Sequence, residues 1–201
     1  MRRKKLCYLA LLLVVLFSFI QTNELKAFAE PDGERIGNTD TYWKIDGDTL
    51  IISGTGEMAK FESDSSNNPW RNDIESIKKV VIMNGMKSIG ENAFKDCTSL
   101  ESVEVPDNIT SIGIGAFQNC TSLTDIELPE EVTWLGGFAF YGCTSLTSIK
   151  LPEGVTEIGS HAFDGCTSLT SIKLPENVTT IGEYAFFGCT SLASMVIMPR
   201  L

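Results

Sequence analysis

Five cysteines recur at a constant 23-residue step: Cys97, Cys120, Cys143, Cys166 and Cys189. Thiols of this kind can form disulfides, ligate zinc or act as nucleophiles. However, five is an odd number, and no Cys-x₂₋₄-Cys pair is present to hold zinc. In-register neighbours in stacked strands lie about 4.8 Å apart, beyond the Cβ separation of about 3.5–4.5 Å in disulfides. We therefore expect free thiols that are buried as small apolar side chains.

The remaining reactive residues form no catalytic or metal-binding set. His161 is the single histidine, and its repeat position is filled by Asn92, Gly115, Phe138 and Tyr184 in the other repeats. No G-x-S-x-G motif accompanies it, so a Ser/His nucleophile has no partners. Asp46 and Asp48 are too few carboxylates for calcium, and a hairpin turn explains them. The sequence predicts a non-enzymatic protein with no cofactor and no metal.

The same 23-residue step relates a glycine column, Gly90, Gly113, Gly136, Gly159 and Gly182, and an Ala-Phe pair in each repeat. Eight positions stay apolar in every complete repeat. In the fifth repeat they are Ile172, Leu174, Val178, Ile181, Ala185, Phe186, Cys189 and Leu192. One such unit cannot enclose eight side chains by itself, but stacked units bury them against their neighbours.

The local pattern predicts the shape of each repeat. Leu-x-x-Ile-x-Leu alternates with period two and ends at a proline, which is typical of a short strand. Val-x-x-Ile-Gly is a second extended piece, and its glycine marks either a backbone turn or a close approach. From there to the cysteine the apolar spacing is helix-like, as for Ala162 and Cys166, so we expect a short helical or 3₁₀ turn. Together these elements predict a leucine-rich-repeat solenoid.

The spacing L-x-x-I-x-L-P-x-x-V-x-x-I-G-x-x-A-F-x-x-C over residues 77–201 resembles the BspA-like class of leucine-rich repeats. This resemblance implies a secreted or surface-exposed protein, from a bacterium or a mucosal parasite, with a role in adhesion to host proteins or other cells. Because roles vary among members of the class, the resemblance does not identify the ligand.

The N-terminus resembles a signal peptide over residues 1–29. Four basic residues, 2–5, precede an apolar run from Leu6 to Ile20, and Ala27-Phe28-Ala29 matches a cleavage site. The apolar run is shorter than the roughly 20 residues of a membrane-spanning helix, so a retained anchor is the less favoured alternative. We expect a secreted, extracellular protein, which could be associated with a cell surface but has no stable membrane anchor.

Residues 30–76 lack the repeat and are predicted to form a β-hairpin capping segment. Strands at residues 41–45 and 49–53 would flank the Asp46–Asp48 turn, with Trp43 and Trp70 covering the first repeat. An independent ligand-binding module is the alternative. At the other end, a sixth repeat begins at Ala193, shifts its proline to Pro199 and stops at Leu201. Either its last coil is left exposed, or the chain is a shortened relative of a longer protein.

Two sets of residues are candidates for binding a protein. The first comprises the outward strand positions, acidic in the middle repeats and basic in the later ones: Lys79, Ser102, Asp125, Ser148 and Ser171 in one column, and Val81, Glu104, Glu127, Lys150 and Lys173 in the other. The second comprises aromatic residues at positions otherwise polar or small: Trp134, Phe138, Tyr141, Tyr184 and Phe187. The alternatives are an ordinary solvated face for the first set and packing between adjacent turns for the second.

These features favour an adhesin-like solenoid that binds another protein, of unknown identity, through its repeat face. The formal charge of −10 argues against nucleic acid and anionic membranes as partners. Two alternatives stay open. The chain could be a surface or matrix component that self-associates through its C-terminal coil, or the recognition part of a longer secreted enzyme.

Overall fold

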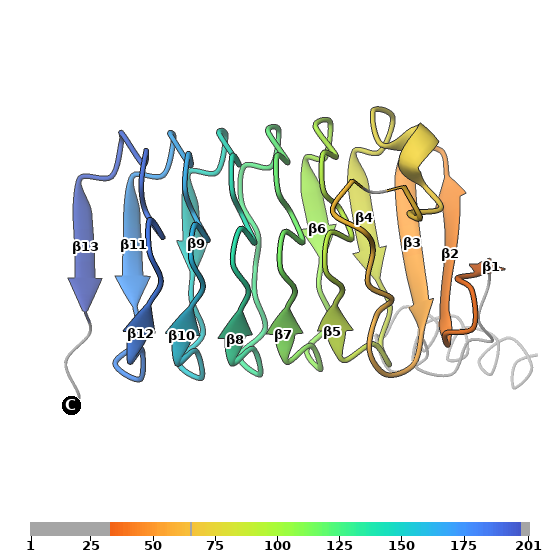
Figure 1. The fold of residues 1–201 in the computed structure, drawn as a ribbon, viewed down its shortest axis with the longest axis horizontal. Helices are drawn as coiled ribbons and strands as arrows, with labels where there is room; N and C mark the ends of the chain where they lie inside the picture. The colour runs from red at the N-terminus through yellow and green to blue at the C-terminus, as the bar shows by residue number, and fades with distance from the viewer. Residues whose placement is uncertain (1–32, 65, 198–201) are drawn as a thin grey trace, which may run out of the picture. The chain divides into compact units, whose positions relative to one another are not determined.

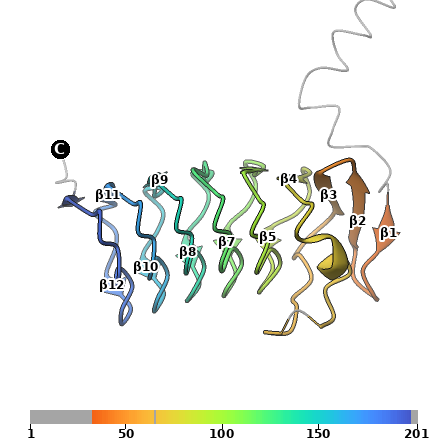
Figure 2. The ribbon, with the colours of Figure 1, turned by 90° about the horizontal axis from the view of Figure 1, so that it is seen from above.

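The computed structural model describes residues 33–64 and 66–197. The predicted signal peptide, residues 1–29, lies outside these described residues. From the hairpin onward the described chain winds into a solenoid whose coils stand in a single row, one coil for each 23-residue repeat (Figure 1). Figure 2, seen from above, shows the same row of coils. The predicted fold, a leucine-rich-repeat solenoid preceded by a β-hairpin, is confirmed.

The first strand of each coil lies in one parallel column, which continues the N-terminal hairpin. The hairpin strands are antiparallel: β1 (Glu34–Arg35), β2 (Thr41–Asp46) and β3 (Thr49–Gly54). Two parallel strands complete this sheet: β4 (Lys79–Ile82) and β6 (Ser102–Glu104). Three more strands of the column form a second sheet: β9 (Ser148–Lys150), β11 (Ser171–Leu174) and β13 (Ser194–Ile197). Between the two sheets the third coil forms only an isolated bridge, from Glu127 to Lys150.

The second extended piece of each coil forms a parallel sheet of five two-residue strands. These are β5 (Ser88–Ile89), β7 (Ser111–Ile112), β8 (Trp134–Leu135), β10 (Glu157–Ile158) and β12 (Thr180–Ile181). A glycine follows each strand because the neighbouring coil passes directly over it. A β-carbon on Gly159 would lie 2.3 Å from the backbone nitrogen of Gly137. Of the two interpretations of the glycine column, the close approach is therefore correct.

The third side of each coil is a chain of tight turns. In the fourth coil, Ala162 N donates to Gly159 O at 3.2 Å and Cys166 N donates to Phe163 O at 3.1 Å, which are 3₁₀-type bonds. His161 (φ 57°) and Gly165 (φ 74°) are left-handed and prevent a continuous helix. Alternate N–H groups bond to the next coil instead, as from Phe163 N to Ala185 O at 2.8 Å. Within the described residues the one helix is the 3₁₀ turn η2 (Arg71–Asp73), outside the repeats.

Trp70 lies between the N-terminal hairpin and the first coil. Its buried ring stacks on Phe94 with centroids 6.1 Å apart, and Trp43 of the hairpin lies 5.9 Å from it. Its Nε1 donates to the Ala93 carbonyl oxygen at 3.0 Å, and Asn68 Nδ2 donates to the same oxygen. The buried indole is thereby held by one hydrogen bond and by aromatic contacts with the hairpin and the first coil. That residues 30–76 cap the repeats stays a prediction.

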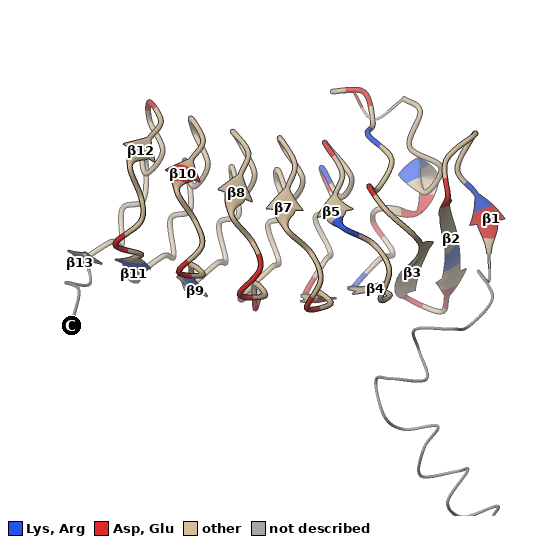
Figure 3. Ribbon diagram, turned by 90° about the horizontal axis from the view of Figure 1, so that it is seen from below, with Lys and Arg blue, Asp and Glu red and all other residues tan. Residues whose placement is uncertain are grey.

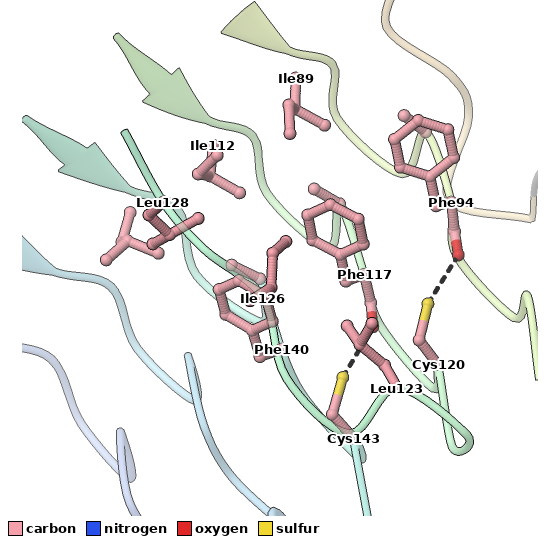
Figure 4. Packing of buried hydrophobic residues seen from close by; sticks show 14 of the residues in the cluster. Ile89, Phe94, Ile112, Phe117, Cys120, Leu123, Ile126, Leu128, Phe140 and Cys143 are labelled. Atoms are coloured by element: carbon pink, nitrogen blue, oxygen red, sulfur yellow. Dashed lines mark hydrogen bonds between the residues drawn. The ribbon is translucent and has the colours of Figure 1, made fainter. Parts of the chain in front are cut away.

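Phenylalanine rings form a continuous stack through the interior. Centroids of successive rings are 5.3–5.4 Å apart along Phe94, Phe117, Phe140, Phe163 and Phe186. Figure 4 shows three of these rings among the inward-facing isoleucine and leucine side chains. Since every interior ring contacts the coil on each side, this stack links the coils into one cooperative core.

Replacing a middle ring of this stack should unfold the chain more readily. Phe140→Ala removes a fully buried ring, so we expect the free energy of unfolding to fall by about 3–5 kcal/mol. The matched control is Phe187→Ala, which removes a ring that is 64% exposed and should lower it by about 1 kcal/mol or less. Urea denaturation of both variants measures the difference. Equal losses would contradict a core organised around the ring stack.

Candidate functional site

The five repeat cysteines carry free thiols, as predicted. Each thiol from the second repeat onward donates to the carbonyl oxygen of a phenylalanine in the preceding coil, as from Cys143 Sγ to Phe117 O at 3.1 Å (Figure 4). Burial raises the pKa of Cys97 and of Cys143 from 9.0 to about 12, and it raises the pKa of Cys120 and Cys166 as well. Protonated, buried thiols serve the core and are unsuited to nucleophilic chemistry.

Within residues 33–64 and 66–197, no three His, Cys, Asp or Glu side chains are grouped so that they could hold a metal ion. His161 and Asp164 are in contact, but no nucleophile completes a catalytic set with them. The residues predicted to bind a protein lie on the strand columns and in the turns.

The outward strand positions are exposed from the second coil onward, and Lys79 and Val81 of the first coil are half-buried. Several of their charges are paired within the chain. Lys79 Nζ lies 2.6 Å from Glu104 Oε1, and Lys150 Nζ lies 2.6 Å from Glu130 Oε1. The hydrogen bond from Lys150 to Glu130 raises the pKa of Lys150 and lowers the pKa of Glu130. Because Lys150 is paired with a neighbouring carboxylate, the basic character predicted for the C-terminal part of this column rests mainly on Lys173. Binding through these columns stays a prediction.

The aromatic residues of the turns come together on one surface. Phe138 and Tyr184 sit one coil either side of His161 and stack on its imidazole, with ring centroids 4.7 Å and 5.0 Å away. Tyr141 lies 5.7 Å from Phe138, and Phe187 lies 5.7 Å from Tyr184. With Asp164, these five residues form what we call the aromatic turn surface: Phe138, Tyr141, His161, Asp164, Tyr184 and Phe187. Tyr184 is 57% exposed, and Phe187 is 64% exposed.

The backbone beneath this surface is unusual. Phe138, His161 and Tyr184 have φ of 57°, 57° and 58°, the left-handed region that bulky side chains rarely adopt. The equivalent position in the first two repeats holds Asn92 and Gly115, which tolerate it well. Three successive coils thus hold an aromatic ring where the backbone disfavours one, and strain of this kind concentrates at functional sites.

His161 and Asp164 lie at the centre of the aromatic turn surface, and the sequence predictions missed both. Nδ1 of His161 is 2.8 Å from Oδ2 of Asp164, and their side chains are 29% and 14% exposed. The available signal was the 23-residue step, which puts His161 between Phe138 and Tyr184 and Asp164 between Tyr141 and Phe187. A lone histidine suggests catalysis by its residue type, whereas its place in the 23-residue step puts it in a stack.

Trp134, also predicted as a binding residue, lies apart from this cluster. It belongs to β8 in the second strand column, where it pairs with Ser111 and Glu157, and it is half-buried. Among the described residues it makes no aromatic ring contact. Its role stays a prediction.

The end of the last described coil exposes apolar side chains. Met195 and Val196 of β13 are exposed, as is Ile181 of β12, and within the described residues β13 pairs with β11 alone. This coil is where the sequence predicts self-association, which stays a prediction.

Charge is distributed unevenly over the coils. From Asp96 to Ile149 the sequence contains no lysine or arginine, and from there to Ile197 it contains only Lys150 and Lys173, on β9 and β11. Figure 3 shows these two basic strands on one column, with acidic residues recurring along the turns between the columns. The aromatic turn surface therefore carries no lysine or arginine, and Glu183 and Asp164 make its surroundings acidic.

Comparison with known proteins gives a consistent picture. Residues 67–199 match six copies of the family described as the BspA type leucine rich repeat region. No curated protein matches the chain. A crystal structure of a leucine-rich repeat protein from Eubacterium ventriosum is similar, with 30% identity and a TM-score of 0.70 over 81% of this chain. The chain spans only 43% of that protein.

Two further crystal structures are similar. The leucine-rich repeat protein of T. pallidum has 28% identity and a TM-score of 0.59, over 81% of this chain and 71% of its own length. A leucine rich cell surface protein from Faecalibacterium prausnitzii has 25% identity and a TM-score of 0.53, over 84% of this chain and 55% of its own. All three share the repeat architecture.

The raised thiol pKa values predict how the repeat cysteines react. At pH 8 a pKa of about 12 instead of 9.0 lowers the thiolate fraction roughly a thousandfold. We expect Ellman's reagent to modify the native chain slowly, with the half-buried Cys189 first, and the urea-unfolded chain at once. Since unfolded thiols ionise near pH 9 and these folded ones near 12, the free energy of unfolding should fall as pH rises above 9. Fast, uniform native labelling would contradict buried thiols.

Proposed function

Since the chain belongs to the BspA-type leucine-rich repeat family, whose fold serves protein interaction, we propose that it is an adhesin-like protein that binds another protein through its aromatic turn surface. It acts by recognition rather than by catalysis. The single observation that carries this proposal is the stack of Phe138, His161 and Tyr184, which is flanked by Tyr141 and Phe187 on the outside of a folded solenoid.

The energetics favour a binding role for these rings. The chain already buries an aromatic stack in its core, so a second stack outside is not needed to join the coils. Exposed aromatic side chains that are held rigidly lose little conformational entropy on binding and are common anchors of protein interfaces. Here the neighbouring rings hold each other, and the backbone that presents them is fixed by hydrogen bonds to the next coil, such as Phe138 N to Ser160 O at 2.9 Å.

The stacking geometry favours a protein partner over a saccharide. A sugar ring packs against the flat face of an aromatic ring, but the neighbours in the stack cover both faces of His161 and one face of Phe138. The stack therefore presents mainly ring edges. Apolar and aromatic side chains of another protein can pack against such edges in the tilted or edge-to-face arrangement that ring pairs prefer.

Two observations support export to the cell surface. Residues 1–29 have the pattern of a signal peptide, and the similar protein of Faecalibacterium prausnitzii is described as a cell surface protein. Over the part of the chain that the structure describes, no helix is long and apolar enough to cross a membrane. We propose that the exported chain meets its partner outside the cell, on a host surface or on a neighbouring cell.

The proposal predicts how the fluorescently labelled chain binds to cultured epithelial cells. We expect saturable binding that is lost when the cells are first treated with protease, because the ligand is a protein. The double variant Tyr184→Ser, Phe187→Ser should weaken binding about tenfold or more, since truncating two interface anchors removes at least about 1.4 kcal/mol. Flow cytometry over a range of chain concentrations measures this.

The control changes the strand columns, which are the other candidate binding face. It replaces four outward residues with glutamine and leaves the net charge unchanged: Glu104, Glu127, Lys150 and Lys173. Its binding should stay within about twofold of the parent chain, as for surface residues outside an interface. If this control loses binding and the aromatic variant keeps it, the strand columns bind the partner and the assignment to the turns is wrong. Binding to cells that have been treated with protease would contradict the proposal that the ligand is a protein.

A further inference from the structure

One position of the aromatic turn surface is a carboxylate instead of a ring. Tyr141 and Phe187 occupy the same turn position in the third and fifth coils, and Asp164 occupies it in the fourth. We propose that Asp164 and these two rings bind a cationic side chain, an arginine, presented by the protein partner. This inference rests on the proposed function, since it names the chemistry of the partner at that surface.

The spacing of the coils leaves room for a cation beside Asp164, between Tyr141 and Phe187. In-register coils are about 4.8 Å apart, so Tyr141 and Phe187 are separated by about 9.6 Å along the solenoid axis. A cation midway between them would lie about 4.8 Å from each residue along the axis, within the roughly 6 Å over which a cation and an aromatic ring attract. The ring of Tyr141 is tilted by 52° to that of Phe138, and the ring of Phe187 stands at 88° to that of Tyr184, so the cation would meet two inclined rings instead of two parallel faces. It would also have room for contact distances of about 3.5 Å on either side. A ring in place of Asp164 would fill that space, as the ring of His161 does in the adjacent column.

The carboxylate is prepared to accept hydrogen bonds from such a cation. An ionised carboxylate only accepts, so His161 donates from Nδ1 to Oδ2 of Asp164, which fixes the side chain. The second oxygen, Oδ1, accepts no hydrogen bond from any other described residue. It lies toward the fifth coil, where a β-carbon on Gly188, the residue after Phe187, would come within 3.5 Å of it. With its side chain 14% exposed, the carboxylate is largely withdrawn from water, which strengthens its attraction to a cation.

Apart from His161, which already contacts Oδ2 of Asp164, the described chain places no cationic side chain at this surface. The lysines of the coils that carry it, Lys150 and Lys173, both project from the strand columns instead of the turns. Lys150 is moreover paired with Glu130. Glu183, next to Tyr184, is exposed and adds a further negative charge. The complementary charge must therefore come from the partner.

Arginine fits this arrangement better than lysine. The guanidinium group is flat, is weakly hydrated and stacks on aromatic rings, while its N–H groups can still donate sideways to a carboxylate. An ammonium group is compact and strongly hydrated, and it would fill the space between two rings less completely.

The test uses the full chain and a short glycine–serine peptide that carries one arginine. Titration followed by ¹H–¹⁵N NMR should shift the amide signals of Tyr141, Asp164 and Phe187 in a saturable manner. The same peptide with citrulline in place of arginine keeps the shape and loses the charge, and it should bind about tenfold more weakly or not at all, as expected for loss of a charge-assisted contact. Equal binding of the two peptides would overturn the inference.

Variants of the chain locate the site. Asp164→Asn keeps the shape and an acceptor for His161, and it should weaken binding of the arginine peptide about tenfold. Asp107→Asn makes the same change of charge at an exposed turn away from the surface and should leave binding unchanged. Equal weakening by the two variants would show non-specific charge attraction and overturn the site. Phe187→Leu replaces an exposed ring without touching the core, so its loss of affinity tests the site even if Asp164→Asn folds poorly.

Cell binding by these variants distinguishes a failure of the arginine site from a failure of the proposed function. If Asp164→Asn binds cells as the parent chain does while Tyr184→Ser, Phe187→Ser does not, the arginine site is wrong and protein binding through the rings stands. If neither variant changes cell binding, both proposals fail.

Discussion

The register of one coil upon the next is the constraint on which the whole molecule depends. Backbone hydrogen bonds join neighbouring coils at equivalent positions of the 23-residue repeat, and glycines such as Gly159 let neighbouring backbones approach to a distance that no β-carbon would allow. Because the step is constant, any residue type that recurs at it becomes a stack. Inside, this produces the phenylalanine stack. Outside, it produces the stack of Phe138, His161 and Tyr184. The core and the aromatic turn surface are thus two consequences of one repeat.

Much of the fold could be predicted from the sequence because burial and register follow directly from periodicity. The inward positions, the hairpin and the free thiols are found as expected. The turn between glycine and cysteine was less predictable. Its apolar spacing fits a helix, but the left-handed conformation of residues such as His161 converts it into separate 3₁₀-type turns. The residue types Phe and Tyr do not predict that conformation, because both disfavour it and adopt it here only under the register of their neighbours.

The candidate site was predictable in part. Phe138, Tyr141, Tyr184 and Phe187 were recognised as aromatic residues at unusual positions, but their assembly around His161 and Asp164 requires knowing that turn positions face outward in register. Trp134 was grouped with them by residue type alone. It precedes the turn and lies on β8, in the second strand column. The pairing of Lys150 with Glu130 could not be predicted from the sequence either. It joins two flexible side chains of neighbouring coils that do not occupy equivalent positions of the repeat.

Which side of the solenoid meets the partner is the central claim, and site-specific photo-cross-linking tests it most directly. A photoreactive benzoyl-phenylalanine is placed at Phe187, on the aromatic turn surface, and in a separate chain at Lys173, on the strand column. Both positions are exposed, so both probes can reach a bound protein. With the chain bound to cells, our account predicts that irradiation couples a protease-sensitive partner to the Phe187 probe and little to the Lys173 probe. Coupling that is confined to Lys173 would contradict it.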